Sequence, residues 1–135
     1  MRLARTLALL LLATSTAACA ATTYDTSIST ETLAPTTTVL PKGTAVELLP
    51  QLVTESAGLS ALILDGGDKI AAVERMEALW AGAQTEVTNG DRDLANEINA
   101  QVVKSRAAAT FNRPAAADKA YRNIKVLVQA YLSTA

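Results

Sequence analysis

Residues 65–91 read DGGDKIAAVERMEALWAGAQTEVTNGD, a helical pattern enclosed by two turn signals. Asp65-Gly66-Gly67-Asp68 can end one helix and begin another, because glycine tolerates the left-handed conformation at a helix end and aspartate accepts amide hydrogen bonds at a helix start. The second signal, Asn89-Gly90-Asp91, has the same chemistry. Apolar positions recur between them at spacings of three and four, at Ile70, Val73, Met76, Trp80, Ala83 and Val87. The stretch predicts a helix that meets another helix through a short turn at each end.

A second helix is predicted upstream, from Thr44 to the turn at Asp65. Thr44 and Glu47 have the spacing of a capping box, in which the two side chains satisfy the first amide donors of the helix. Pro50 lies within this stretch, where it removes a backbone hydrogen bond and clashes with the preceding turn. Either the helix kinks at Pro50 or its regular part begins there, and we expect the kink.

Two more helices are predicted downstream, one from Asp91 to Phe111 and one from Pro114 onward. The first of these has the weakest apolar face, since Gln101 and Ser105 stand where core residues are expected. The second carries an apolar seam of Ala117, Tyr121, Ile124, Val128 and Tyr131.

Helices joined by such short turns must fold back on their neighbours. We therefore expect residues 43–134 to form one all-α domain, an antiparallel up-down-up-down four-helix bundle. A three-helix bundle with a loosely docked extra helix is the alternative, because of the polar positions in the third helix. The core is expected to be rich in alanine, with Trp80, Tyr121, Tyr131 and Phe111 supplying most of its bulk.

Residues 19–42 have a different composition, dominated by threonine and serine and interrupted by Pro35 and Pro41. The segment shows no helical or strand periodicity. It has too little apolar surface to offset the entropy lost on ordering, so a disordered tether is predicted.

The first eighteen residues have the basic start, apolar middle and small-residue end of a secretory signal peptide, and Cys19, the only cysteine, follows them. Ala17-Ala18-Cys19 fits a lipobox, although Thr16 stands where leucine is usual, and the segment resembles the precursor of a bacterial lipoprotein. The resemblance implies that Cys19 carries fatty acyl chains such as palmitate and anchors the protein on the extracytoplasmic side of the cell membrane. Ordinary cleavage after Ala18 or Ala20, which would release a secreted protein, is the alternative.

The two halves of the domain differ in charge. Residues 41–90 hold three basic and seven acidic side chains, whereas residues 91–135 hold seven basic and four acidic ones. The bases include a candidate contact strip on the last helix, formed by Arg113, Lys119, Arg122 and Lys125, with Lys104 and Arg106 on the helix before. Asp118 is placed to pair with Arg122, and a solvated polar face is the favoured explanation of the strip. As a functional surface it would bind anionic lipid or an acidic envelope polymer. Nucleic acid is not an expected partner, because the protein is exported and acidic overall.

The chain has no histidine, which removes the common general base and the common metal ligand. No cofactor or metal site is expected, and Glu74 and Glu77 are expected on the solvated side of their helix. We therefore expect a non-enzymatic, lipid-anchored interaction or scaffolding module of the bacterial cell envelope, bound to the membrane through Cys19 and to an envelope protein or anionic polymer. The alternatives are a small-ligand binding or sensing domain, with a cleft near Pro50, Gln101 and Ser105, and, more remotely, a carboxylate-dependent hydrolase.

Overall fold

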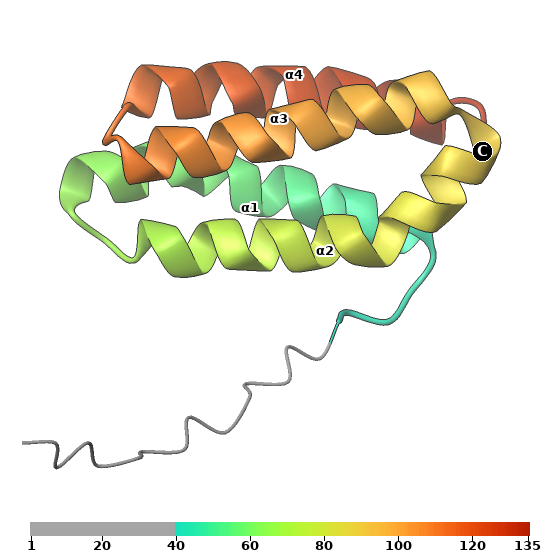
Figure 1. The fold of residues 1–135 in the computed structure, drawn as a ribbon, viewed down its shortest axis with the longest axis horizontal. Coiled ribbons are helices and arrows are strands. Elements are labelled where there is room, and N and C mark those ends of the chain that lie inside the picture. The colour runs from blue at the N-terminus through green and yellow to red at the C-terminus, as the bar shows by residue number, and fades with distance from the viewer. Residues whose placement is uncertain (1–39) are drawn as a thin grey trace, which may run out of the picture. The chain divides into compact units, whose positions relative to one another are not determined.

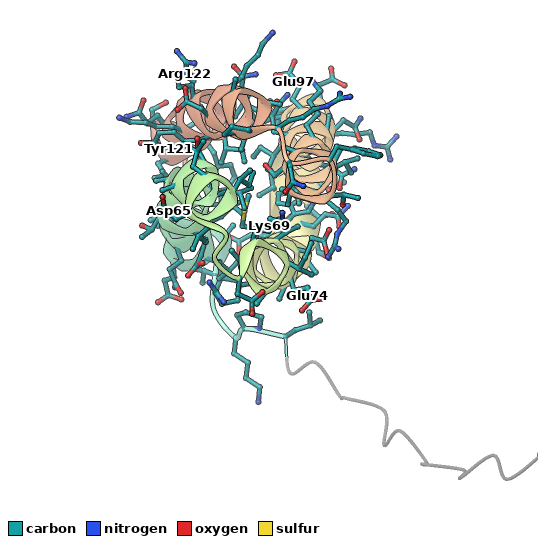
Figure 2. The ribbon with its side chains drawn as sticks, turned by 90° about the vertical axis from the view of Figure 1, so that its left-hand side faces the viewer. Asp65, Lys69, Glu74, Glu97, Tyr121 and Arg122 are labelled. Atoms are coloured by element: carbon teal, nitrogen blue, oxygen red, sulfur yellow. The ribbon has the colours of Figure 1, made fainter. Side chains whose placement is uncertain are left out.

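The computed structural model describes residues 40–135, which form four α-helices. They are α1 (Ala45–Asp65), α2 (Lys69–Gly90), α3 (Arg92–Thr110) and α4 (Pro114–Leu132). Successive helices run in opposite directions and pack side by side, and α4 returns to pack against α1 (Figure 1). Seen from one end, the four helices surround a common core (Figure 2). The predicted antiparallel four-helix bundle is confirmed.

The third helix is a full member of the bundle, because α3 packs against both α2 and α4. Its polar positions are buried, with Gln101 exposing 8% and Ser105 0% of their surface. Both are hydrogen-bonded: the Ser105 hydroxyl donates to the carbonyl of Gln101 at 3.0 Å, and Oε1 of Gln101 accepts from Nδ2 of Asn123 on α4 at 3.2 Å. Paired polar groups can be buried without a large penalty. The three-helix alternative is therefore wrong.

The core is mainly aliphatic. Its largest fully buried side chains come from all four helices and include Leu48, Leu49, Leu52, Leu59, Met76, Ile98 and Ile124. Trp80 and Tyr131 are buried as expected, and the indole nitrogen of Trp80 donates to Oδ1 of Asn99 at 3.0 Å. All members of the core cluster belong to the sequence range from Ala45 to Tyr131, so the described residues have a hydrophobic core of their own.

Two of the aromatic residues expected in the core do not supply it. Phe111 is 64% exposed, because it follows the last residue of α3 and lies at the surface of the turn to α4. Tyr121 is half-buried and lies between α4 and α1 at the outer edge of the bundle (Figure 2). Four leucines of α1 belong to the core cluster, namely Leu48, Leu49, Leu52 and Leu59.

The turns form as their residues predict. Gly66 adopts a left-handed conformation with φ of 70°, and the backbone N–H of Gly67 donates to the carbonyl of Leu62 at 2.9 Å. Oδ1 of Asp68 accepts from the amide of Ala71 at 3.0 Å, and Oδ1 of Asp91 accepts from the amide of Leu94 at 3.0 Å. Each helix therefore ends or begins at a residue whose side chain or backbone satisfies its terminal groups.

The turn between α3 and α4 uses asparagine in place of glycine. Asn112 has a positive φ of 52°, and the amide of Arg113 donates to the carbonyl of Ala108 at 2.8 Å. Pro114 then begins α4, where its missing N–H has no helical partner to lose. Lys69, at the start of α2, donates from Nζ to Oδ1 of Asn112 and joins the two turns at this end of the bundle.

The predicted capping box of Thr44 and Glu47 forms at the start of α1, where Oε2 of Glu47 accepts from the amide of Thr44 at 2.9 Å. Pro50 lies inside one continuous helix that begins at Ala45, so the regular part of α1 does not start at the proline. The kink at Pro50 stays a prediction.

The predicted signal peptide, Cys19 and nearly all of the predicted tether lie outside the described residues. Of the predicted tether, the structure describes Leu40, Pro41 and Lys42, which are not helical and lead toward α1.

Candidate functional site: a basic hollow between α3 and α4

A hollow of about 260 Å³ opens on the surface between the second half of α3 and the first half of α4. Its charged side chains are Lys104 on α3, Arg113 in the turn and Lys119 on α4, and we call the site the basic hollow. The other residues that line it are Gln101, Ala107, Ala108, Ala116, Ala120 and Asn123.

The space exists because its floor is built from alanine. Ala108 and Ala120 are buried against the core, and Ala107 and Ala116 lie above them at the surface. A methyl group fills little of the gap between two helices, so longer side chains at the rim surround an opening. The small residues that let α3 and α4 pack together also form the hollow.

The hydrogen bond between Gln101 and Asn123 shows how α3 is aligned with α4. These residues lie eleven positions before and eleven after Asn112 in the turn. Lys104 and Lys119 lie eight before and seven after it, so they occupy nearly the same level of the two antiparallel helices. Two lysines therefore flank the hollow at one level, with Arg113 at its turn end and the Gln101–Asn123 pair at the other.

None of the three cations makes an ion pair with an acidic side chain of residues 40–135, and no carboxylate lines the hollow. All three are exposed. The guanidinium of Arg113 lies 5.5 Å from the ring centre of Phe111, within the range of a cation–π contact. The hollow therefore carries positive charge that the surrounding protein does not neutralise.

Part of the predicted contact strip lines the hollow. Arg113 and Lys119 come together in the hollow, but Arg122 pairs with Asp118 at 2.7 Å, as expected, and Lys125 lies away from the hollow lining. Positions three apart advance around a helix by about 300°, which leaves them about 60° apart, so Lys119, Arg122 and Lys125 are neighbours on the exposed face of α4.

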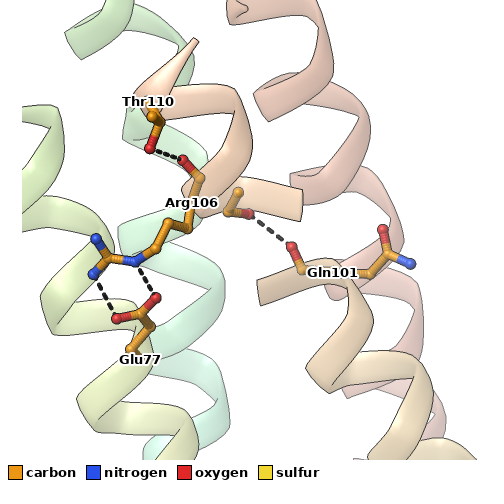
Figure 3. A network of polar contacts seen from close by, with 5 residues as sticks. Glu77, Gln101, Arg106 and Thr110 are labelled. Carbon is orange, nitrogen blue, oxygen red and sulfur yellow. Dashed lines mark hydrogen bonds and ion pairs between the residues drawn. The ribbon is translucent and has the colours of Figure 1, made fainter. Parts of the chain in front are cut away.

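Arg106, which the sequence grouped with Lys104, turns to the opposite side of α3. Its Nε and Nη2 donate to the two carboxylate oxygens of Glu77 on α2, the latter at 2.6 Å (Figure 3). These bonds raise the pKa of the Arg106 guanidinium above its ordinary value. Glu77 is thus half-buried in a contact between helices and was wrongly expected on the solvated side, whereas Glu74 is exposed as expected.

A larger groove of about 850 Å³ runs along α2 beside the described end of the tether. Its charged lining is formed by Glu55, Glu74, Arg75, Glu77 and Arg106. Four of these groups pair with one another, Arg75 with Glu55 at 3.0 Å and Arg106 with Glu77, and Glu74 makes no ion pair within residues 40–135. The groove therefore offers less uncompensated charge than the basic hollow, despite its size.

Glu86 makes a polar contact that the sequence did not reveal. Its Oε2 accepts from the amide of Ala45, the first residue of α1, at 2.8 Å, and its Oε1 accepts from the hydroxyl of Tyr131 on α4 at 3.3 Å. Burial first, and then the charge of Glu86 and its hydrogen bond, raise the pKa of Tyr131 above its ordinary value. Glu86 joins three helices at one end of the bundle.

The cleft expected near Pro50, Gln101 and Ser105 does not gather these residues. Ser105 has no exposed surface, and Gln101 lines the basic hollow. Pro50 lines neither the basic hollow nor the larger groove along α2.

In the part of the chain that the structure describes, no three histidine, cysteine, aspartate or glutamate side chains gather closely enough to hold a metal ion. No helix within residues 40–135 is both long and apolar enough to cross a membrane. Comparisons with protein-family models, with curated proteins and with solved structures found no match to this chain.

Proposed function

We propose that the protein is a non-enzymatic interaction module of the bacterial cell envelope, held to the membrane by a lipid on Cys19, and that the basic hollow binds an anionic group of its partner. The observation that carries this proposal is the cluster of Lys104, Arg113 and Lys119 around one opening without a neutralising carboxylate. A protein surface with unpaired charge of one sign attracts groups of the opposite sign and orients them as they approach.

Three of the carboxylates on α1 and α2 have other roles in this bundle, whereas Glu74 is exposed and makes no ion pair within residues 40–135. Glu77 is engaged by Arg106, Glu55 by Arg75, and Glu86 by Ala45 and Tyr131. A general acid or base must be free to exchange a proton with a substrate, and each of these three carboxylates already accepts hydrogen bonds from the protein. This arrangement supports the non-enzymatic proposal.

The membrane anchor is tested by expressing the full chain and its Cys19→Ala variant in a bacterium, then measuring intact mass and membrane partitioning. A native protein that begins at Cys19 and carries acyl chains, together with a variant that is released or unprocessed, supports the anchor. An unmodified native protein free in the medium contradicts it.

Partner binding is tested by sedimenting residues 40–135 with isolated cell envelopes over a range of salt concentrations. We expect binding that weakens as salt rises and is lost in the double variant Lys104→Glu and Lys119→Glu. The matched control is the double variant Arg92→Glu and Lys125→Glu, which changes the charge equally outside the hollow and should bind as the native bundle does. Equal loss in both variants would contradict a role for the hollow.

A further inference from the structure

The basic hollow holds hydrogen-bond donors of three kinds. Lys104 and Lys119 each present an ammonium group, and Arg113 presents a planar guanidinium. The fourth donor is Nε2 of Gln101, whose side chain is buried except for 8% of the residue surface and extends from α3 toward α4 (Figure 3). Its Oε1 accepts from Asn123, but its Nε2 has no hydrogen-bond acceptor within residues 40–135. The hollow thus has an amide donor that reaches solvent besides its three cations. Gln101 and Asn123 also line a neighbouring depression of about 240 Å³, whose lining includes Glu97.

The positive field of the hollow comes from its side chains. The amino end of α4 and the carboxyl end of α3 meet at the same turn, so the partial charges of the two helix ends offset one another. The side-chain charges are not offset, because the lining includes three cations and no carboxylate. A ligand for this site must therefore be an anion, because one neutral hydrogen-bond acceptor would leave the three cations without a counter-charge.

We propose that the basic hollow is a binding site for a phosphoryl group, an inference that rests on the proposed function. A phosphate ester carries up to two negative charges and three strong acceptor oxygens. Cations on two flanks and at the turn end, with the Gln101 amide at the other end, match such a group. A lone carboxylate has two oxygens and one charge, and it leaves part of this donor set unused. The opening to solvent leaves room for the remainder of an ester to extend from the site.

The facing lysines explain why a bound anion should stabilise the bundle. Lys104 and Lys119 lie at one level across the hollow, and like charges on adjacent elements repel when no counter-charge lies between them. A phosphoryl group between them replaces this repulsion with two charge-assisted contacts. Phosphate is therefore expected to raise the melting temperature of the native bundle more than chloride does at the same ionic strength.

The inference is tested by nuclear magnetic resonance titration of residues 40–135 with inorganic phosphate at constant ionic strength, with acetate as the comparison. We expect phosphate to shift the backbone signals of the hollow and the side-chain amide signal of Gln101. The double variant Lys104→Gln and Lys119→Gln should bind phosphate about tenfold more weakly or worse, since a charged hydrogen bond contributes on the order of 1.5–3 kcal/mol. The control variant Lys125→Gln should bind as the native bundle does. Circular dichroism of each variant shows that the fold is retained.

The source of the phosphoryl group is separated by two further titrations, with soluble glycerol phosphate and with vesicles of phosphatidylglycerol in phosphatidylcholine. Binding of the soluble ester alone supports a soluble ligand, whereas binding of the vesicles that depends on Lys104 and Lys119 supports a lipid head group. Shifts spread evenly over all basic residues, or binding unchanged in the lysine double variant, would overturn the inference. If phosphate, ester and vesicles all fail while salt-sensitive envelope binding still requires the two lysines, the phosphoryl inference is wrong and the proposed function stands.

Discussion

Glu86 on α2 accepts a hydrogen bond from the hydroxyl of Tyr131 on α4, with 3.3 Å between the oxygens, and so joins two helices that are not adjacent in sequence. The other carboxylate oxygen accepts from the amide of Ala45, which has no exposed surface. One exposed side chain thus satisfies the first amide of α1 and the last buried hydroxyl of α4. These two contacts join α1, α2 and α4 at the end of the bundle where α1 begins.

Truncating Glu86 is therefore expected to destabilise the bundle. Glu86→Ala leaves the buried amide of Ala45 without its acceptor, and we expect the free energy of unfolding to fall by about 1–2 kcal/mol in urea denaturation. Glu86→Gln retains one acceptor oxygen, so its free energy of unfolding should lie between those of Glu86→Ala and the native protein. The matched control is Glu74→Ala on the exposed side of α2, with an expected change of less than about 0.5 kcal/mol. Equal losses at the two positions would contradict the role assigned to Glu86.

The raised pKa of Tyr131 predicts a loss of stability in alkali. The folded bundle favours the neutral phenol, because burial and the neighbouring charge of Glu86 both disfavour the phenolate. The unfolded chain ionises near the ordinary tyrosine pKa of about 10. The stabilisation is fully present below that pH and is lost as the pH rises through the raised pKa of the folded state.

Urea denaturation of the native bundle and of Tyr131→Phe over this pH range measures the effect. The native protein should lose more stability than the variant on going from neutral pH to above pH 10 or so. Tyr121→Phe removes another phenol from α4 and is the control, which should retain the alkaline loss of the native bundle. If the free energy of unfolding fell equally with rising pH in Tyr131→Phe and in the native protein, the alkaline loss of stability would not come from Tyr131.

Two helical glycines are expected to respond in opposite directions to alanine. A Cβ at Gly82 of α2 would lie 2.9 Å from the carbonyl oxygen of Pro41 and 2.8 Å from Cδ1 of Leu48. A Cβ at Gly58 of α1 would meet nothing within 4 Å. Alanine gains about 1 kcal/mol over glycine inside a helix, so Gly58→Ala should raise the melting temperature.

Gly82→Ala should lower the melting temperature despite the same gain in helix propensity, because the backbone of Pro41 cannot move aside as a flexible side-chain end can. We expect a net cost of about 1–3 kcal/mol, the range for overpacking in a well-filled site. Thermal denaturation of both variants gives the comparison directly. A stabilised Gly82→Ala protein would show that Pro41 does not pack against α2 in solution.

The sequence predicted the helix limits well because the interactions that set them are local. Gly66, Asp68 and Asp91 satisfy backbone groups within three or four residues, so their effect can be recognised from spacing alone. The same reasoning failed for Phe111, which continues an apolar pattern but follows the end of its helix. A periodic pattern does not show at which residue the last turn stops.

The contacts that build the basic hollow could not be predicted in this way, because they depend on how two helices align. Lys104 and Lys119 line one hollow because of the alignment of α3 with α4, in which Gln101 lies beside Asn123, and the spacing of basic residues along α4 does not reveal that alignment. The partners of Glu86 lie 41 and 45 residues away in the sequence. Such contacts follow from tertiary packing and leave no local pattern.

The ion pair between Glu77 and Arg106 should couple more strongly than the pair between Asp118 and Arg122. The first joins α2 to α3 through two hydrogen bonds, and both side chains are 39% exposed. The second lies within α4, where the side chain of Arg122 is 68% exposed and that of Asp118 is 48% exposed. Two parallel bonds with partial burial favour a coupling near the upper end of the usual range for surface pairs, about 1 kcal/mol, whereas a pair one turn apart on a helix contributes about 0.3–0.5 kcal/mol.

Double-mutant cycles with Glu77→Gln and Arg106→Gln, and with Asp118→Asn and Arg122→Gln, measure both couplings by urea denaturation. Added salt should weaken the Asp118–Arg122 coupling by the larger fraction, since its charges are more open to solvent. A coupling between Glu77 and Arg106 no greater than that of the helical pair would mean that the bidentate contact contributes little to holding α2 against α3. The pairing of the helices would then depend on the apolar core, although the two halves of the domain carry opposite charges.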